Sequence, residues 1–315
     1  MKGETRLSDL LESALGPDVR ELLRDEKISE IRLNSDGSLW ANKLGVGKFC
    51  TESLVSSDNA RRVISAVAYS VNEICNEDKP SIAAELPGTG ERFQGILPPL
   101  SKAPLFVIRK KAVRIFTLAE LEEQGVLSEQ GSAFLQSAVL RKENVLIVGG
   151  TDSGKTTFAN ALLHVIAETT DRIVIIEDTQ ELQCNAKDVE YLRTKDGVAS
   201  LRDLVRTTMR LSPDRIVIGE VRGAEALDLL KAWNTGHGGG VSTVHASSAK
   251  QGLSRIEQLV QEANVQSPSR QMIAEAVNVL VYMEKVGTKR LVKDILRVKG
   301  ADREDYQLEP LELRQ

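Results

Sequence analysis

The chain has 315 residues, of which 41% are hydrophobic and 27% charged, and its formal net charge is −4 at pH 7. These values are typical of a soluble globular protein with two domains or one large one, and they give no global signature of nucleic-acid binding. Cys50, Cys75 and Cys184 form no C-x-x-C pair, which argues against a zinc site or a disulfide framework. The sequence has neither a membrane-spanning apolar run nor a signal-peptide core. We therefore expect a cytoplasmic protein, with docking on a membrane complex left open.

The N-terminal part mixes helical and strand-like patterns. Helical periodicity covers 7–23 and 57–71, and strand-like alternation covers 28–33, 38–41 and 105–109. The apolar stripe of the first helix is interrupted by Gly16-Pro17. These patterns predict a small α+β domain over 1–112, then a linker over 113–130 and a second domain over 131–315.

From Gly131 onward, helices and strands alternate in the sequence. The expected strands are 145–148, 172–176, 215–218 and 241–244, with two more at 277–283 and 291–298, and the expected helices are 131–141, 200–211, 224–233 and 248–261. Such alternation predicts an α/β fold with a mostly parallel sheet covered by helices. Ligands of these sheets bind at the carboxyl ends of the strands.

The most specific motif follows the first of these strands. Gly149 is followed by four residues and then by Gly154-Lys155-Thr156, which is the G-x-x-x-x-G-K-[ST] phosphate-loop pattern. Glycines let successive backbone N–H groups turn toward an anion, and the helix N-terminus adds its positive dipole end. We expect Lys155 to contact the β- and γ-phosphates of ATP and the Thr156 hydroxyl to bind Mg²⁺. The expected nucleotide-binding residues of the loop are Gly149, Gly150, Thr151, Asp152, Ser153, Gly154, Lys155, Thr156 and Thr157.

Polar side chains also follow three other expected strands. Glu177 is predicted to be the general base for the attacking water, with Glu181 supporting it or binding Mg²⁺ through water. Glu220 is predicted to orient Mg²⁺ or its waters, and His245 to sense the γ-phosphate. His237 is a weaker candidate in a glycine-rich loop. Each residue taken alone has an ordinary structural explanation, but their shared sheet edge favours function.

Four arginines lie close in sequence to Glu220, namely Arg206, Arg210, Arg215 and Arg222. Solvated ion pairs are the simplest explanation for each of them. Arginine also stabilises the charge of a transferring phosphoryl group, so one or two could reach the nucleotide of a neighbouring subunit. The sequence does not distinguish which ones.

Four segments together, GGTDSGKTT, IIEDTQEL, RIVIGEVRG and TGHGGGVSTVHASSA, resemble the secretion-superfamily traffic ATPases. In that family they correspond to the phosphate loop, the acidic Asp box, the Walker B strand and the His box. The chain is most similar to the conjugal transfer ATPases of the TrbB type in type IV secretion, and the similarity covers most of its length.

The resemblance implies a RecA-like second domain and a hexameric ring that hydrolyses ATP with Mg²⁺ and moves against a ring of N-terminal domains. It implies Glu177 as the catalytic base and Glu220 as the Walker B acid, with Lys155 and His245 completing the catalytic set. Arg109, near the linker, would approach the nucleotide from the N-terminal domain. The implied partners are the secretion or conjugation machinery at the inner face of the inner membrane, without direct sequence-specific nucleic-acid binding.

One residue departs from the family pattern. Asp152 stands where relatives usually have glycine, and its carboxylate would oppose phosphate by roughly 1–3 kcal/mol at an effective dielectric of about 20. The repulsion would vanish if Asp152 points to solvent or pairs with an arginine. Asp152 favours an alternative function, a nucleotide-gated assembly or regulatory subunit with negligible hydrolysis, whereas the intact Lys155, Glu177, Glu220 and His245 favour the motor. A helicase-like motor is a third interpretation, which the acidic balance disfavours.

Overall fold

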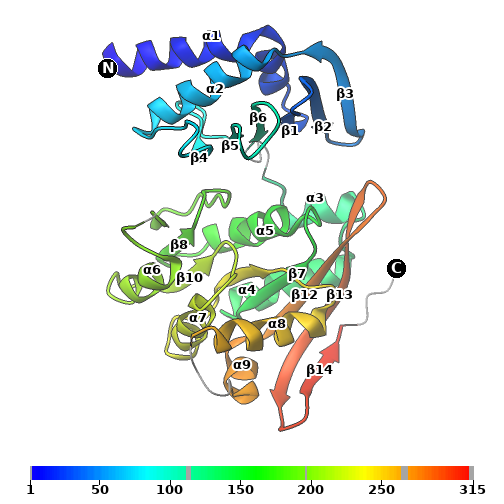
Figure 1. Cartoon of the computed structure of the whole chain (residues 1–315). Coiled ribbons are helices and arrows are strands. Elements are labelled where there is room, and N and C mark those ends of the chain that lie inside the picture. The colour runs from blue at the N-terminus through cyan, green and yellow to red at the C-terminus, as the bar shows by residue number, and fades with distance from the viewer. Residues whose placement is uncertain (1, 111–114, 196, 264–268, 312–315) are drawn as a thin grey trace. The chain divides into compact units, whose positions relative to one another are not determined.

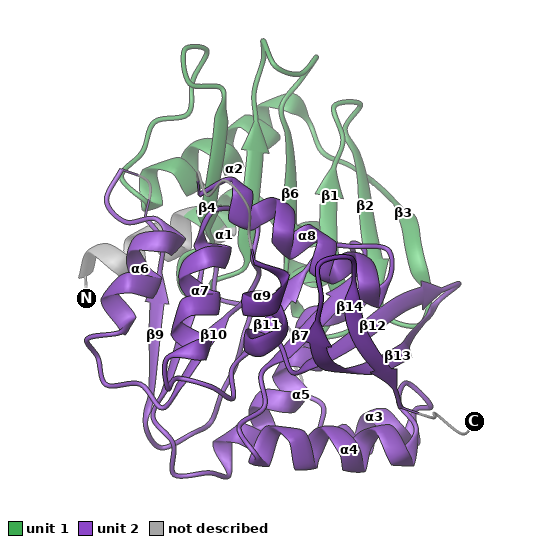
Figure 2. Cartoon of the chain, turned by 90° about the horizontal axis from the view of Figure 1, so that it is seen from below, with its two compact units in different colours: residues 1–113 green, residues 114–315 purple. Residues whose placement is uncertain are grey.

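The computed structural model of the protein describes residues 2–110, 115–195, 197–263 and 269–311 (Figure 1). The chain divides into two compact units, residues 1–113 and residues 114–315 (Figure 2). Helix α3 (Leu118–Glu123) lies within the segment expected to be a linker, 113–130. Its buried Leu118 and Leu121 belong to the core of the second unit.

The described part of the first unit is an antiparallel six-stranded sheet with two helices. Its elements are α1 (Lys2–Arg24), β1 (Ile28–Leu33), β2 (Ser38–Lys43), β3 (Gly47–Leu54), α2 (Ser57–Ser70), β4 (Ser81–Glu85), β5 (Arg92–Ile96) and β6 (Leu105–Arg109). The strand order is β3-β2-β1-β6-β5-β4. Gly16 interrupts the helical backbone of α1 with a φ of 73°, as the Gly16-Pro17 pair predicts. The α+β character expected for this part of the chain is confirmed.

The second unit holds an eight-stranded sheet within its described residues. The elements after α3 are α4 (Glu129–Leu140), β7 (Val145–Gly149), α5 (Lys155–Ala167), β8 (Ile173–Glu177), β9 (Val189–Arg193), α6 (Leu201–Thr208), β10 (Arg215–Ile218), α7 (Glu225–Asn234), β11 (Val241–Val244), α8 (Ala249–Gln261), α9 (Arg270–Ala276), β12 (Val279–Val286), β13 (Lys289–Ala301) and β14 (Tyr306–Pro310). The strand order is β14-β13-β12-β7-β11-β10-β8-β9. Pairing is parallel from β12 to β9, and β13 and β14 add an antiparallel edge. The predicted α/β fold with a mostly parallel sheet is confirmed.

Helices cover both faces of this sheet, with α3 to α5 on one side and α6 to α9 on the other (Figure 2). Side chains alternate between the faces along a strand, so Val145 and Ile147 pack toward the first group while Leu146 and Val148 pack toward the second. Every residue of β7 is therefore buried, which explains its uninterrupted apolar sequence. Within the described ranges, no helix is both long and apolar enough to span a membrane.

Candidate functional site

Four adjacent parallel strands end at one edge of the second sheet. Register pairs β11 with β7 at Val244 and Val148, and β10 with β8 at Ile218 and Ile176. Because these strands run in the same direction, their carboxyl ends carry the phosphate loop, Glu177, Glu220 and His245 to that shared edge. The structure thus brings together the polar strand ends that the sequence singles out.

The phosphate loop has the backbone needed to surround an anion. Gly154 and Asp152 both adopt positive φ, 94° and 61°. An added Cβ at Gly149 would come within 2.5 Å of the Ser153 hydroxyl and 2.6 Å of the Met283 carbonyl, so the loop closes tightly at its first residue. The Ser153 hydroxyl is buried and has no hydrogen-bond partner among the described residues. Glycine-dependent close packing and a buried unused hydroxyl fit a loop that cradles phosphate.

Lys155 begins α5 and is 7% exposed. Its Nζ donates to the carbonyl oxygens of Gly149 at 3.0 Å and Gly150 at 2.9 Å, and lies 3.4 Å from Nδ1 of His245. Burial lowers the pKa of Lys155, and the nearby Glu220 charge opposes that shift. These carbonyl oxygens hold the ammonium group at the loop, which suits a lysine that binds phosphate.

Glu220 and His245 lie beside Lys155, with Oε1 of Glu220 3.0 Å from Nε2 of His245. An ammonium group only donates, so Nδ1 of His245 is the acceptor from Lys155 and the neutral ring carries its proton on Nε2. Burial and the positive charge of Lys155 lower the pKa of His245, in agreement with a neutral ring. Burial alone would raise the pKa of the Glu220 carboxyl, but Arg222, His245 and Lys155 outweigh it and the pKa lies below its usual value.

Arg222 extends this network toward β9. It donates to Oε2 of Glu220 at 2.9 Å and to Oδ2 of Asp178 at 3.3 Å. Asp178 in turn accepts from the Thr194 hydroxyl at 3.0 Å. The sequence pattern gave no indication of this connection between Asp178 and Thr194.

Glu177 is the buried carboxylate of the site, with 6% exposure. Its Oε1 accepts the backbone N–H groups of Glu181 at 3.1 Å and Leu182 at 3.0 Å, which compensate for burial of the charge. The Thr156 hydroxyl donates to Oε2 of Glu181 at 3.3 Å. Gly219 packs directly on Glu177, because an added Cβ there would lie 2.9 Å from its Cγ and Oε1.

Mg²⁺ is the metal that the loop sequence implies. The described residues contain no cluster of three or more His, Cys, Asp or Glu side chains able to hold a metal ion alone. Nucleotide sites bind Mg²⁺ through one or two protein groups together with phosphates and waters, so such a cluster is not required. The hydroxyl of Thr156 and the carboxylates of Glu181 and Glu220 place oxygen atoms beside the loop.

Asp152 is ion-paired, which is one of the two arrangements expected to cancel the repulsion between its carboxylate and phosphate. Its carboxylate contacts Lys285 and accepts from Arg290 at 2.7 Å, and its carbonyl oxygen accepts from Nε of Arg290 at 3.2 Å. Burial would raise the pKa of Asp152, but the two cations outweigh it and lower the pKa. The pairing with an arginine that the sequence left open is the arrangement found. Lys285 and Arg290 were not among the predicted site residues.

Several other candidates lie elsewhere. Arg109 belongs to the first unit, where it pairs with Glu30 at 3.0 Å. Nδ1 of His237 is 2.8 Å from the Pro213 carbonyl, and His237 precedes β11, which places it at the opposite sheet edge from His245. Arg215 is 1% exposed and pairs with Asp171 at 2.6 Å at the start of β10, so it is not one of the arginines able to reach a neighbour's phosphate.

Arg206 and Arg210 lie in or just after α6 and are exposed. Arg206 donates to Asp228 at 3.0 Å. These two arginines, with Arg222, are the members of the predicted arginine group that remain accessible.

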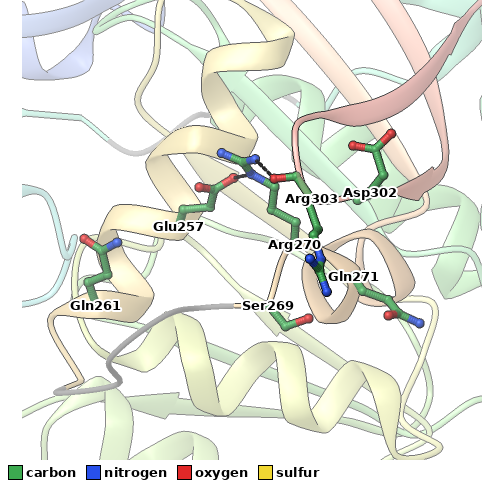
Figure 3. A pocket seen from close by; sticks show the side chains of 8 residues that line it. Glu257, Gln261, Ser269, Arg270, Gln271, Asp302 and Arg303 are labelled. Atoms are coloured by element: carbon green, nitrogen blue, oxygen red, sulfur yellow. Dashed lines mark hydrogen bonds and ion pairs between the residues drawn. The ribbon is translucent and has the colours of Figure 1, made fainter.

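A separate hollow of about 470 Å³ lies between α8, α9 and the loop before β14 (Figure 3). Arg270 at its centre donates to Glu257 at 3.0 Å and to the carbonyl oxygens of Arg303 at 2.9 Å and Glu304 at 2.8 Å. None of the residues that line the hollow was predicted to be functional. The bonds of Arg270 within the chain favour a structural role, fastening α9 to the turn before β14.

A family model described as "Type II/IV secretion system protein" matches residues 24–297. The chain belongs to this family. Among curated relatives, the probable conjugal transfer protein TrbB of Sinorhizobium fredii is 43% identical over 311 residues, covering 98% of this chain and 95% of that protein. The type IV secretion system protein PtlH of Bordetella pertussis is 33% identical and covers 87% and 91% of the two chains. The predicted resemblance to type IV secretion and conjugal transfer ATPases is therefore confirmed.

Two solved structures are similar to this chain. The VirB11 ATPase of the Brucella suis type IV secretion system, in complex with sulphate, is 25% identical with a TM-score of 0.50, covering 94% of this chain and 97% of that one. The Legionella pneumophila ATPase DotB is 19% identical with a TM-score of 0.64, covering 89% and 79%. DotB shares the fold of this secretion-family chain.

Proposed function

We propose that this chain is an ATPase that energises conjugative pilus assembly or substrate export in a type IV secretion system, and that it works as a hexameric ring. One observation carries the proposal: a phosphate loop, a buried carboxylate and a linked Glu220–His245 pair occupy one edge of a parallel sheet. Family membership and the similarity to conjugal transfer proteins support the biological setting.

In the proposed mechanism the loop binds the phosphates of ATP through its backbone N–H groups and Lys155. Glu177 accepts a proton from the water whose oxygen attacks the γ-phosphorus, and the bond from that phosphorus to the ADP oxygen breaks. Thr156 and Glu220 would hold Mg²⁺, which would neutralise charge on the phosphoryl oxygens. His245, which touches both Lys155 and Glu220, senses whether Lys155 is engaged with phosphate.

The proposed ring places exposed cations at the nucleotide of a neighbouring subunit. Arg222, which contacts Glu220, is the accessible candidate beside the site, Arg206 and Arg210 are exposed on or just after α6, and Arg109 is the candidate from the N-terminal unit. Arginine suits this role because its charge persists and its planar fork matches phosphate oxygens. The proposed partners are further copies of this chain and the secretion or conjugation machinery at the inner membrane.

The alternative, a nucleotide-gated subunit with negligible hydrolysis, depended on an unpaired carboxylate in the loop. The ion pairs of Asp152 remove that support. A phosphate-release assay on purified protein with Mg-ATP separates the two. Repeated phosphate release by the wild-type protein that is lost in Lys155→Ala supports the ATPase. Tight binding of Mg-ATP without phosphate release supports the alternative.

A further inference from the structure

Asp152, Lys285 and Arg290 form a charge cluster that joins the phosphate loop to the β12–β13 hairpin. Register places Lys285 of β12 directly opposite Arg290 of β13, and pairs Met283 of β12 with Gly149 at the start of the loop. The hairpin thus runs beside the loop from its first residue. Asp152 is separated from Arg290 by 138 positions in the sequence, so the contact is purely tertiary.

Two cations opposite each other on paired strands are destabilising unless an anion lies between them. Asp152 supplies that anion, since its carboxylate contacts both Lys285 and Arg290. Arg290 also hydrogen-bonds the backbone, because its Nε donates to the Asp152 carbonyl oxygen while its Nη2 donates to the Asp152 carboxylate. Two cations and one carboxylate leave the cluster with one net positive charge beside the phosphate loop.

The cluster also controls the shape of the loop. Asp152 has a φ of 61°, a conformation that favours glycine and is uncommon for other residues. The Arg290 side chain packs along Gly154, where an added Cβ would lie 3.2 Å from its Cδ. Arg290 therefore touches the loop at two residues, and one of them directly precedes Lys155.

We propose that Arg290, assisted by Lys285, is a positioning residue for nucleotide binding: it holds Asp152 in its left-handed conformation and neutralises the charge that Asp152 would otherwise present to the phosphates. The proposal deepens the proposed ATPase function and rests on it. Arg290 acts through Asp152, so its removal should weaken nucleotide affinity and leave the chemical step unchanged. Its importance should also depend on the Asp152 side chain being present.

A double-mutant cycle with Asp152→Gly and Arg290→Gln tests this dependence. Calorimetry with Mg-ADP and a non-hydrolysable Mg-ATP analogue gives Kd, and steady-state phosphate release gives KM and kcat. Arg290→Gln should raise Kd and KM about fivefold, as expected for a partly exposed ion pair, with kcat within about twofold. In the Asp152→Gly background, where glycine tolerates the positive φ, the same substitution should change Kd by less than about twofold.

Lys293→Gln is the matched control, because Lys293 lies on the same strand as Arg290. The Lys293 side chain pairs with Glu284 at 3.8 Å and has no contact with the loop among the described residues. It should leave Kd unchanged. Arg290→Lys should restore affinity only partly, because lysine keeps the charge and lacks the fork that joins carboxylate to carbonyl.

Equal costs of Arg290→Gln in both backgrounds would overturn the proposal, as would a parallel fall in kcat. Failure of the proposed ATPase gives a different result. Wild-type protein would then bind the Mg-ATP analogue but release no phosphate from Mg-ATP, and the Kd cycle would still decide the role of Arg290.

Discussion

Replacing Glu177 with glutamine is expected to stop ATP hydrolysis while leaving the fold and nucleotide binding intact. Oε1 of Glu177 accepts two backbone N–H groups at 3.1 and 3.0 Å, and a glutamine amide oxygen can accept the same pair. The substitution therefore removes the charge and the proton acceptor without leaving buried donors unpaired. Loss of a general base typically lowers the rate about 10²- to 10⁴-fold, which corresponds to roughly 3–5 kcal/mol of transition-state stabilisation.

The assay is phosphate release at saturating Mg-ATP, with analogue binding by calorimetry and thermal unfolding as checks on affinity and fold. Gly219→Ala offers an independent perturbation of the same group, because its Cβ would lie 2.9 Å from Glu177 and must displace the carboxylate. We expect it to cost about ten- to a hundredfold in kcat, the size of effect that a small misplacement produces.

Glu181→Gln is the comparison that locates the base, since Glu181 lies four residues further along the chain and accepts from Thr156. It should reduce kcat less than Glu177→Gln does. Retention of more than about a tenth of wild-type turnover by Glu177→Gln would refute the assignment, given the usual size of the effect. A larger loss in Glu181→Gln would transfer the role of base to Glu181.

Three further predictions concern the lysine, the histidine and the assembly. Lys155→Ala should leave less than about a tenth of the hydrolysis because the charge at the phosphates is lost, with circular dichroism showing an intact fold. Burial and the charge of Lys155 lower the pKa of His245 from its ordinary 6.5, so stability and hydrolysis should stay level above pH 6.5 and fall as the pH drops through the lowered pKa. His245→Gln should remove this loss at acid pH, and a variant with the wild-type pH profile would contradict the prediction. Light scattering with Mg²⁺ and a non-hydrolysable ATP analogue should detect a hexamer, and a monomer under those conditions would argue against any arginine acting between subunits.

The sequence predicted the α/β arrangement well because each buried strand is an uninterrupted apolar run beside an amphipathic helix. It missed β3 (Gly47–Leu54), an edge strand of mixed exposure, and β14 (Tyr306–Pro310), another edge strand with mostly polar residues. Edge strands bury little of either face, so they carry little hydrophobic periodicity. Helix α9 was also missed, since its seven residues span only about two turns.

The contacts of the candidate site were only partly predictable. Strand ends are local features, and parallel pairing brings them together, so the positions of Lys155, Glu177, Glu220 and His245 could be predicted in outline. The partners of Asp152 lie 133 and 138 positions away, and no local pattern links them to the loop. Arg215 stayed among the four candidate arginines because it lies close to Glu220 in sequence. It begins β10 whereas Glu220 follows its end, so the two lie at opposite edges of the sheet.

Burial divides the groups at this edge into two kinds. Glu177 and Lys155 are 6% and 7% exposed, whereas the side chains of His245 and Arg222 are 43% and 54% exposed. Moving Glu177 would leave the two backbone N–H groups that it accepts without a hydrogen-bond partner. Each such loss costs about 1–3 kcal/mol, so the position of Glu177 is fixed. Exposed ion pairs contribute only about 0–1 kcal/mol, so His245 and Arg222 can exchange partners at little cost. If Lys155 binds phosphate as proposed, the groups able to rearrange in response are therefore His245, Glu220, Arg222 and Asp178. Glu177 keeps its position, as the proposed role of general base requires.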